Sequence, residues 1–177
     1  MMKIQTAPIK SEEECPYNQN CNFDSLYVWD VCPPSNPAIC GTASHSAIDV
    51  QGACPDGWHL PTYLEWMSLI KAVGGEEIAG QKLKSTSGWN DSGNGSDAVG
   101  FSALPGGGWL TVDESGDEIG YEACFWTASQ YVSATRRFYE AYSINFVSEH
   151  GLALPRENTF KVWGNSVRCV QNKRRYY

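Results

Sequence analysis

Charged residues are scarce in this chain of 177 residues, where Asp, Glu, Lys and Arg together make up 19% of the sequence. Basic side chains are the scarcer kind, because 13 Lys and Arg stand against 20 Asp and Glu, for a net charge of −7 at pH 7. A surface with this excess of negative charge repels phosphate backbones and anionic lipid surfaces. The composition therefore argues against nucleic acid as a partner.

Long apolar runs are missing as well. No stretch approaches the roughly 20 apolar residues that a helix needs to cross a bilayer. Residues 1–10 also lack the apolar segment that a signal peptide requires. We therefore expect no direct membrane insertion, and we expect any export signal to lie outside residues 1–177.

The seven cysteines form no C-x-x-C pair, the spacing typical of zinc ribbons and of thioredoxin-like redox sites. Seven are many for a reducing cytosol, so disulfides in an oxidising compartment explain them better. We therefore expect an extracellular or bacterial cell-surface protein. The economical local pairs are Cys15 with Cys21 and Cys32 with Cys40, although the sequence alone leaves their connectivity open.

The length favours a single domain, and 17 Gly, 7 Trp and 9 Tyr favour strands and long ordered loops over helices. Residues 1–53 carry five prolines and four cysteines with little periodicity, which predicts extended loop with short strands such as residues 25–30. Residues 85–108 are dominated by Gly, Ser, Asn and Asp, which predicts a long ordered loop. Strands are predicted over residues 122–129, 137–147 and 165–171. In the second, alternation puts Tyr142, Ile144 and Phe146 on one face and Ala141, Ser143 and Asn145 on the other.

A helix is predicted to begin after Pro61, because Thr62 and Glu65 have the spacing of a capping box. Its apolar face recurs at helical spacing, and Gly74–Gly75 supplies the permissive backbone that ends it; the apolar positions are Trp66, Leu69, Ile70 and Val73. A second, shorter helix is predicted over residues 76–84.

Four segments stand out by their order and spacing: CPDGWHLPTYLEWMSL (54–69), AGQKLKSTSGWNDSGNGSDAVGFSALPGGGW (79–109), FWTAS (125–129) and SVRCVQ (166–171). Together they resemble the Fibrobacter succinogenes major paralogous domain, over Leu26 to Gln171. That family is similar to the wider C-type-lectin-like group, to which the formylglycine-generating enzymes also belong. Its members are mostly secreted or surface-anchored bacterial proteins with no settled activity.

The resemblance implies an α+β, C-type-lectin-like fold with two short helices, small twisted antiparallel sheets and long ordered loops, braced by disulfides. The expected organisation is an extended cysteine-containing segment over residues 1–25, the lectin-like domain over 26–172 and a C-terminal tail over 173–177. Because such folds set the first helix beside the final strand, the resemblance also implies a Cys54–Cys169 disulfide. Cys124 is then left over, and we expect it to be a buried free thiol.

One departure from the family lies at the front of the chain. The usual opening strand is short or missing before Cys15. The first sheet edge is therefore either incomplete or completed by a strand from a partner.

The loop segment WNDSGNGSD carries four hard-oxygen side chains among glycines: Asn90, Asp91, Asn94 and Asp97. Such oxygens on a flexible loop are what calcium binds, although the spacing is not that of an EF-hand. The alternative is a set of Asx-turns, in which short polar side chains bond their own backbone. The resemblance favours calcium somewhat, since related lectin-like and formylglycine-generating proteins bind it in the corresponding loop.

Aromatic rings outside the helices are candidates for stacking on sugar faces, with core packing as the alternative role for each. Polar side chains in the late segment could add hydrogen bonds to a ligand, or form a solvated surface. The predicted ligand-binding residues are Trp89, Trp109, Tyr121, Tyr139, Arg156 and Asn158. Trp109 follows three glycines and is the ring we most expect to be exposed.

No catalytic residue is predicted. His45, His59 and His150 form no metal-ligand pair, and no serine lies in a G-x-S-x-G elbow. The formylglycine-generating reaction uses two cysteines near the domain end, whereas this chain has only Cys169 there. We therefore expect a non-catalytic extracellular binding module that recognises carbohydrate through its long loop and late strands. The alternatives are a protein-binding surface adhesin or assembly component, fused to or joined with a larger surface protein, and a hydrolytic or formylglycine-generating enzyme.

Overall fold

The secondary structure combines two helices with short and long strands. The computed structural model describes residues 4–6, 27–28, 54–108, 118–131, 140–161 and 163–172. The elements are β1 (Ile4–Thr6), β2 (Tyr27–Val28), β3 (Trp58–His59), α1 (Tyr63–Ala72), α2 (Glu76–Leu83), β4 (Glu122–Tyr131), β5 (Glu140–Val147), β6 (Ala153–Phe160), β7 (Gly164–Asn165) and β8 (Arg168–Gln171). This composition confirms the predicted α+β class.

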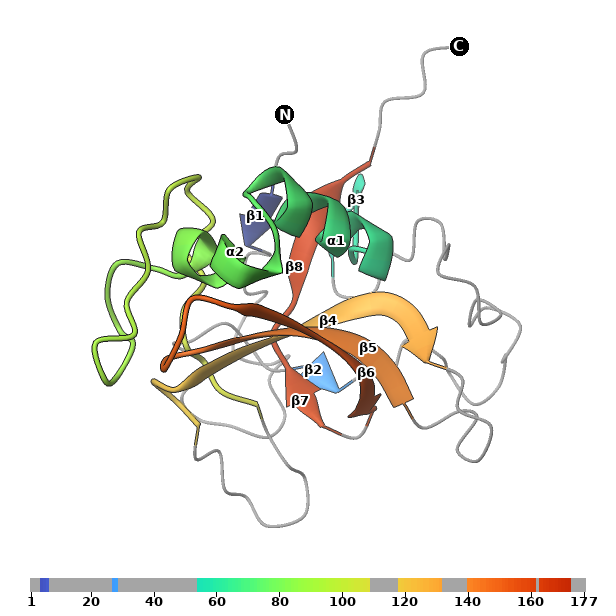
Figure 1. The fold of residues 1–177 in the computed structure, drawn as a ribbon. Helices are drawn as coiled ribbons and strands as arrows, with labels where there is room; N and C mark the ends of the chain where they lie inside the picture. Colours follow the sequence, from blue (N-terminus) through green and yellow to red (C-terminus); the bar gives the residue numbers. More distant parts are fainter. Residues whose placement is uncertain are drawn as a thin grey trace.

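The strands form three small antiparallel sheets, ordered β4-β5-β6, β1-β8-β3 and β2-β7. Helices α1 and α2 lie on one face of the β4-β5-β6 sheet, and β2-β7 lies on its other side (Figure 1). Strand β8 runs close to α1, so an early helix and the last strand are neighbours in space (Figure 1). Strand β1 pairs with β8, which shows that a short opening strand is present at this sheet edge.

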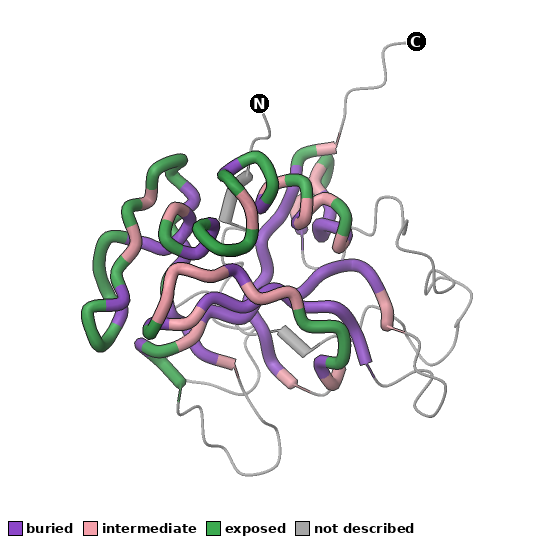
Figure 2. The backbone as a smooth tube through the Cα atoms, viewed as in Figure 1, coloured by how far each residue is buried: buried purple, intermediate pink, exposed green. Residues whose placement is uncertain are grey.

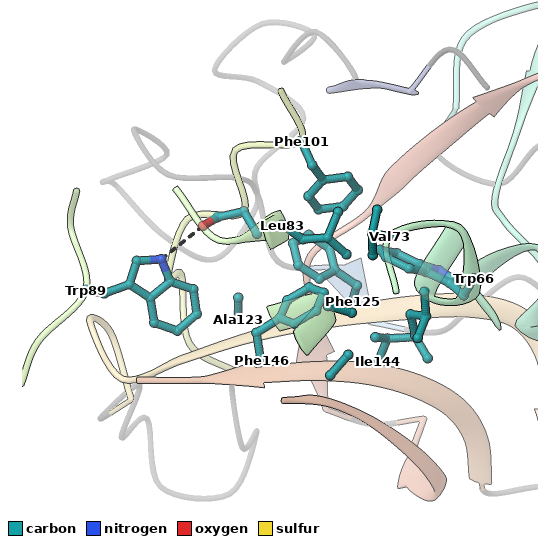
Figure 3. Close-up of a cluster of buried hydrophobic side chains, with 13 residues drawn as sticks. Trp66, Val73, Leu83, Trp89, Phe101, Ala123, Phe125, Ile144 and Phe146 are labelled. Atoms are coloured by element: carbon teal, nitrogen blue, oxygen red, sulfur yellow. Dashed lines mark hydrogen bonds between the residues drawn. The ribbon is translucent and has the colours of Figure 1, made fainter. Parts of the chain in front are cut away.

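The main core lies between the helices and the β4-β5-β6 sheet. Phe125 is fully buried at its centre, with its ring centroid 5.5 Å from that of Trp66 and 5.9 Å from those of Phe101 and Phe146. These rings meet edge-on or tilted, the arrangements that the aromatic quadrupole favours (Figure 3). The predicted apolar face of the first helix supplies Trp66, Ile70 and Val73 to this cluster.

Strand β5 is buried on both of its faces (Figure 2). Ile144 and Phe146 belong to the apolar core, as the alternating sequence predicts. Ser143 and Asn145 point to the other face, where Ser143 Oγ donates to Asn145 Oδ1 and lies 2.7 Å from Thr159 Oγ1. The second face of the sheet is therefore a buried polar layer, which a half-buried strand with one solvated face would not have.

Strand β6 was not predicted, because residues 153–160 have no alternation of apolar and polar side chains. It forms the edge of the sheet, and its exposed residues Arg156, Glu157 and Asn158 are polar. Charged edge positions are typical of strands that must not pair with other chains. The register also shifts between the pairs Ala141–Thr159 and Ser143–Arg156, which further obscures the period of two.

A disulfide joins Cys54 to Cys169, with a Cα–Cα distance of 5.8 Å, as the resemblance implied. Both cysteines are buried in a second apolar cluster with Leu60, Trp126 and Val167. Cys124 is a buried free thiol, which confirms the expectation for this residue. The predicted pairs Cys15–Cys21 and Cys32–Cys40 lie outside the described residues.

The predicted capping box is present at the start of α1. Glu65 N–H donates to Thr62 Oγ1, and the Glu65 carboxylate accepts from the Thr62 backbone N–H and hydroxyl. The same carboxylate lies 3.1 Å from His59 Nε2, while His59 Nδ1 lies 2.6 Å from Asn172 Oδ1. This network ties the start of α1 to β3 and to the residue after β8.

Replacing Thr62 by Ala should lower the free energy of unfolding by about 1 kcal/mol, because two backbone N–H groups lose or loosen their partner. Urea denaturation of the two proteins measures this difference. Ser68→Ala is the matched control, since Ser68 Oγ is exposed and bonds only the Leu64 carbonyl within its own helix. An equal loss in both variants would contradict a specific role for the cap.

The same network makes the free energy of unfolding depend on pH in the acid range. Although burial raises the pKa of Glu65, hydrogen bonds from Thr62 and His59 outweigh this and hold the pKa below its ordinary value. A carboxyl group with a lowered folded-state pKa stabilises the fold above its ordinary pKa, and that contribution is lost as the pH falls through the folded-state value.

Candidate functional site

The long loop between α2 and β4 is anchored by a tryptophan that the sequence placed among the ligand-binding residues. Trp89 is 5% exposed, and its Nε1 donates to Ser85 Oγ and to the Ala103 carbonyl (Figure 3). Its ring also lies 4.7 Å from the Lys84 ammonium. Both ring and N–H are thus used inside the protein, which is the core-packing alternative for this residue.

Two of the four predicted metal ligands use their oxygens within the loop. Asn94 Oδ1 accepts the backbone N–H of Trp89, and the Asp97 carboxylate accepts the backbone N–H and the hydroxyl of Ser102. Both side chains thus bond groups of the loop itself, as in the alternative to calcium, although the partners lie five residues away and not at the two-residue spacing of an Asx-turn. Asn90 and Asp91 are exposed. Two side chains supply few of the six to eight oxygens that calcium takes, so backbone carbonyls and water would have to provide the rest.

The described residues contain no group of three or more His, Cys, Asp or Glu side chains arranged to hold a metal ion. Within the same residues, no helix is long and apolar enough to cross a membrane.

The loop meets the turn before β4 at Asn90 and Gly120. Asn90 N–H donates to the Gly120 carbonyl at 2.8 Å, and the Asn90 side chain lies against the Gly120 backbone. Gly120 has φ +88°, and a Cβ there would lie 2.5 Å from Asn90 Nδ2, so a glycine is required twice over. This contact brings Asn90 next to Tyr121, whose side chain is 43% exposed.

Tyr121 is held at its backbone from two sides. Its N–H donates to the Glu118 carbonyl within the turn, and its carbonyl accepts the N–H of Ser148 from the β5–β6 turn. These two bonds fix the backbone that carries the exposed ring, between the α2–β4 loop and the β4-β5-β6 sheet.

Charged side chains gather directly beside this tyrosine in sequence. Glu122, the first residue of β4, pairs with Arg156 of β6 at 3.5 Å between Oε1 and Nη2. Burial raises the pKa of Glu118, and the neighbouring Glu122 carboxylate raises it further. The side chains of Glu122 and Arg156 are 18% and 45% exposed, so the pair is open to solvent on one side.

The charged pair continues inward into the polar layer beneath the sheet. Glu122 Oε2 accepts from the Cys124 thiol at 3.4 Å and from Asn145 Nδ2 at 3.4 Å. Asn145 Nδ2 also lies 3.0 Å from Cys124 Sγ. Burial, with the adjacent Glu122 carboxylate, raises the pKa of the Cys124 thiol well above its ordinary value, so the thiol is neutral and not a nucleophile.

Of the six predicted ligand-binding residues, Tyr121 lies in the turn directly before β4, and Arg156 of β6 pairs with Glu122, the residue after Tyr121. Asn158 is exposed farther along β6, where the register shifts, and no described hydrogen bond joins it to this cluster. Trp109 and Tyr139 lie outside the described residues.

The sequence analysis missed Glu118, Glu122 and Asn145. In the sequence, Glu122 and Cys124 alternate with the apolar residues Ala123 and Phe125. This alternation is the one signal that could have placed Glu122 and Cys124 on a common face of β4.

A small cleft lies apart from this cluster, between α1 and β8. Its lining includes Glu65, Phe101 and Arg168, and its volume of about 10 Å³ is the space of roughly one water molecule. The Arg168 guanidinium lies 4.9 Å from the Phe101 ring and donates to the Ser102 carbonyl. These contacts make the cleft part of the packing between α1 and β8.

Residues 7–171 match the family described as Fibrobacter succinogenes major domain. The match begins earlier in the chain than the Leu26 expected from the motifs. No curated protein and no solved structure matches the chain.

Proposed function

Because the chain belongs to the Fibrobacter succinogenes major domain family, we propose that it is a non-catalytic extracellular binding module that recognises carbohydrate. The observation that carries the proposal is the exposed side chain of Tyr121, which directly precedes Glu122, the partner of Arg156, in the chain. Sugar binding commonly combines an aromatic face with carboxylate, amide and guanidinium groups that bond the hydroxyls.

A location outside the cell is part of this proposal, and it is supported by the Cys54–Cys169 disulfide. We also propose that the fold is C-type-lectin-like. Its support is the placement of α1 beside β8, the disulfide that links the segment before α1 to β8, and the pairing of β1 with β8.

A screen of the oxidised protein on a broad glycan array, in calcium buffer and again in EDTA, tests the proposal. Binding that persists in EDTA would support carbohydrate recognition without a metal ion. Binding that is lost in EDTA would support a calcium-assisted site, with the loop of Asn90 and Asp91 as the candidate for it. An array with no binding, or release of cleaved sugar from a bound glycan, would overturn the proposal.

Tyr121→Ala should weaken the binding of an array hit about tenfold, which corresponds to ~1.4 kcal/mol, because the sugar loses its stacking face. Isothermal titration calorimetry measures the change. Leu64→Ala is the matched control, since Leu64 is 52% exposed on α1, away from the turn. Equal affinity in wild type and Tyr121→Ala would show that the Tyr121 ring does not contribute to sugar binding.

A protein receptor is the second candidate, and the exposed apolar side chains of the long loop and the next turn favour it. Val99, Leu104 and Ile119 are 56%, 37% and 56% exposed. Such side chains contribute more to a protein interface than to a sugar site. A negative array followed by capture of one defined surface protein, lost in Ile119→Asp, would favour this candidate.

A further inference from the structure

Two carboxyl groups meet in the turn that carries Tyr121. The backbone N–H groups of Tyr121 and Glu122 both donate to the Glu118 carbonyl, at 2.9 and 3.0 Å, so residues 118–122 form a single helical turn. Side chains four positions apart lie on the same face of such a turn. The carboxyl groups of Glu118 and Glu122 accordingly lie within hydrogen-bonding reach of each other.

Two carboxyl groups at this distance need a proton between them, because an ionised carboxylate accepts hydrogen bonds and cannot donate one. Glu122 is the natural acceptor, since its Oε1 faces Arg156 and its Oε2 accepts from Cys124 Sγ and Asn145 Nδ2. Glu118 is exposed, so its carboxyl group exchanges a proton readily with solvent. The shared proton therefore belongs to Glu118, which donates it to the Glu122 carboxylate.

The groups around the pair set how tightly this proton is held. Burial and the Glu122 carboxylate raise the pKa of Glu118, while the Arg156 guanidinium lowers it. Cys124 faces the pair from β4 as a neutral thiol. When Glu118 is ionised, two negative charges in one turn stand against the single positive charge of Arg156, and like charges four positions apart repel each other. The proton therefore decides whether the two side chains attract or repel.

The two ends of the turn are held in different ways. At the Tyr121 end, the Gly120 N–H donates to the Pro105 carbonyl and the Tyr121 carbonyl accepts the Ser148 N–H, and neither bond titrates. At the other end, the carboxyl contact holds the side chain of Glu118. Loss of the proton therefore loosens the turn from its Glu118 end.

We propose that the proton shared by Glu118 and Glu122 is a pH-sensitive switch for the turn that carries Tyr121. With the proton in place, the two side chains bond each other and the turn is closed, so the exposed ring is fixed. Without it, the carboxylates repel each other and the turn opens, so the ring moves more freely. As a control of ligand binding, the switch rests on the proposed function, which gives Tyr121 a sugar to bind; the opening of the turn itself needs no ligand.

Amide hydrogen exchange of the full oxidised chain, followed by NMR, tests the switch without a ligand. The reporters are the N–H groups of Tyr121 and Glu122, whose bonds to the Glu118 carbonyl close the turn. Because the folded-state pKa of Glu118 is raised, the closed turn is favoured below that value and is lost as the pH rises through it. We expect protection factors at least about tenfold lower at about pH 7 than at about pH 4, the effect of losing one hydrogen bond to a charged group.

Glu118→Gln is the decisive variant, because its side-chain amide donates to Glu122 at every pH and its protection factors should be the same at both. Glu77→Gln, an exposed position of α2, is the matched control and should behave like wild type. An equal fall in Glu118→Gln, or no fall in wild type, would overturn the switch. If the array identifies a glycan, wild type should bind it more tightly in acid and Glu118→Gln equally at both pH values. Protection factors that behave as expected together with a negative array would leave the switch standing and the proposed function overturned.

The midpoint of the titration gives a second readout that a purely structural contact would not move. The Arg156 guanidinium lowers the pKa of Glu118, so Arg156→Gln should shift the midpoint to higher pH. The neighbouring carboxylate raises the same pKa, so Glu122→Gln should shift the midpoint to lower pH. The ¹³C chemical shift of the Glu118 carboxyl group measures both changes. A midpoint that stays at the wild-type pH in both variants would overturn the switch.

Discussion

Loss of the Cys54–Cys169 disulfide should lower the free energy of unfolding by about 4–5 kcal/mol. The two cysteines are 115 residues apart, and closing a loop of this length removes roughly that much chain entropy from the unfolded state. This is a large part of the about 5–15 kcal/mol by which a typical domain is stable. The double variant Cys54→Ala/Cys169→Ala should therefore unfold at a much lower urea concentration than wild type.

The single variants give the internal control for this result. Because one bond is lost in every case, Cys54→Ala, Cys169→Ala and the double variant should lose similar amounts. The disulfide is also shielded, since the cysteines are 3% and 1% exposed, so a thiol reductant should cleave it only once denaturant opens the fold. A double variant as stable as wild type would show that packing around Leu60 and Trp126 alone holds the chain ends.

The local elements of this fold were largely predictable because local chemistry dictates them. The Thr62–Glu65 capping box, the apolar face of α1 and the Gly74–Gly75 stop depend on residues within one or two turns of each other. The faces of β5 followed from alternation in the same way. The Cys54–Cys169 pair instead came from resemblance, because spacing does not determine disulfide connectivity.

The candidate site was predictable only in part because it is built from distant segments. Trp89 resembled a surface aromatic in a polar loop, yet the bonds to Ser85 and Ala103 draw it into the core. Conversely, alternation could at most have placed Glu122 and Cys124 on one face of β4, and only strand pairing brings Asn145 to them. Side-chain burial of this kind depends on tertiary contacts that neither composition nor periodicity records.

Lys84 is the clearest example of such a contact, and it connects the fold to the candidate site. The residue is 1% exposed, and its ammonium donates to the carbonyls of Val147 at 2.9 Å, His150 at 3.1 Å and Ser148 at 3.5 Å. It thereby fastens the β5–β6 turn to the end of α2. The Ser148 N–H of that same turn donates to the Tyr121 carbonyl, so Lys84 is a positioning residue for the exposed ring.

Replacing Lys84 by Met should therefore lower the free energy of unfolding by about 3 kcal/mol, because three buried carbonyls lose a charged donor while the side-chain volume is kept. The affinity for any glycan that the array identifies should fall as well, since the turn that holds Tyr121 is released. Lys82→Met is the matched control: Lys82 lies in the last turn of α2, two residues before Lys84, and donates to one carbonyl, that of Val73. Its loss should be under about 1 kcal/mol.

The pH dependence of the Lys84→Met difference provides a further check with a definite sign. Burial lowers the pKa of Lys84 below its ordinary value of 10.5, so the unfolded chain binds more protons than the folded one between these two values. Lys161, whose burial lowers its pKa to about 8, makes stability rise with pH in both proteins, so the measure is the difference between them: wild type must gain stability over Lys84→Met as the pH rises across the Lys84 window. A difference between the two proteins that stays constant up to pH 10.5 would mean that the pKa of Lys84 is not lowered, because water or the three carbonyls compensate the ammonium for its burial.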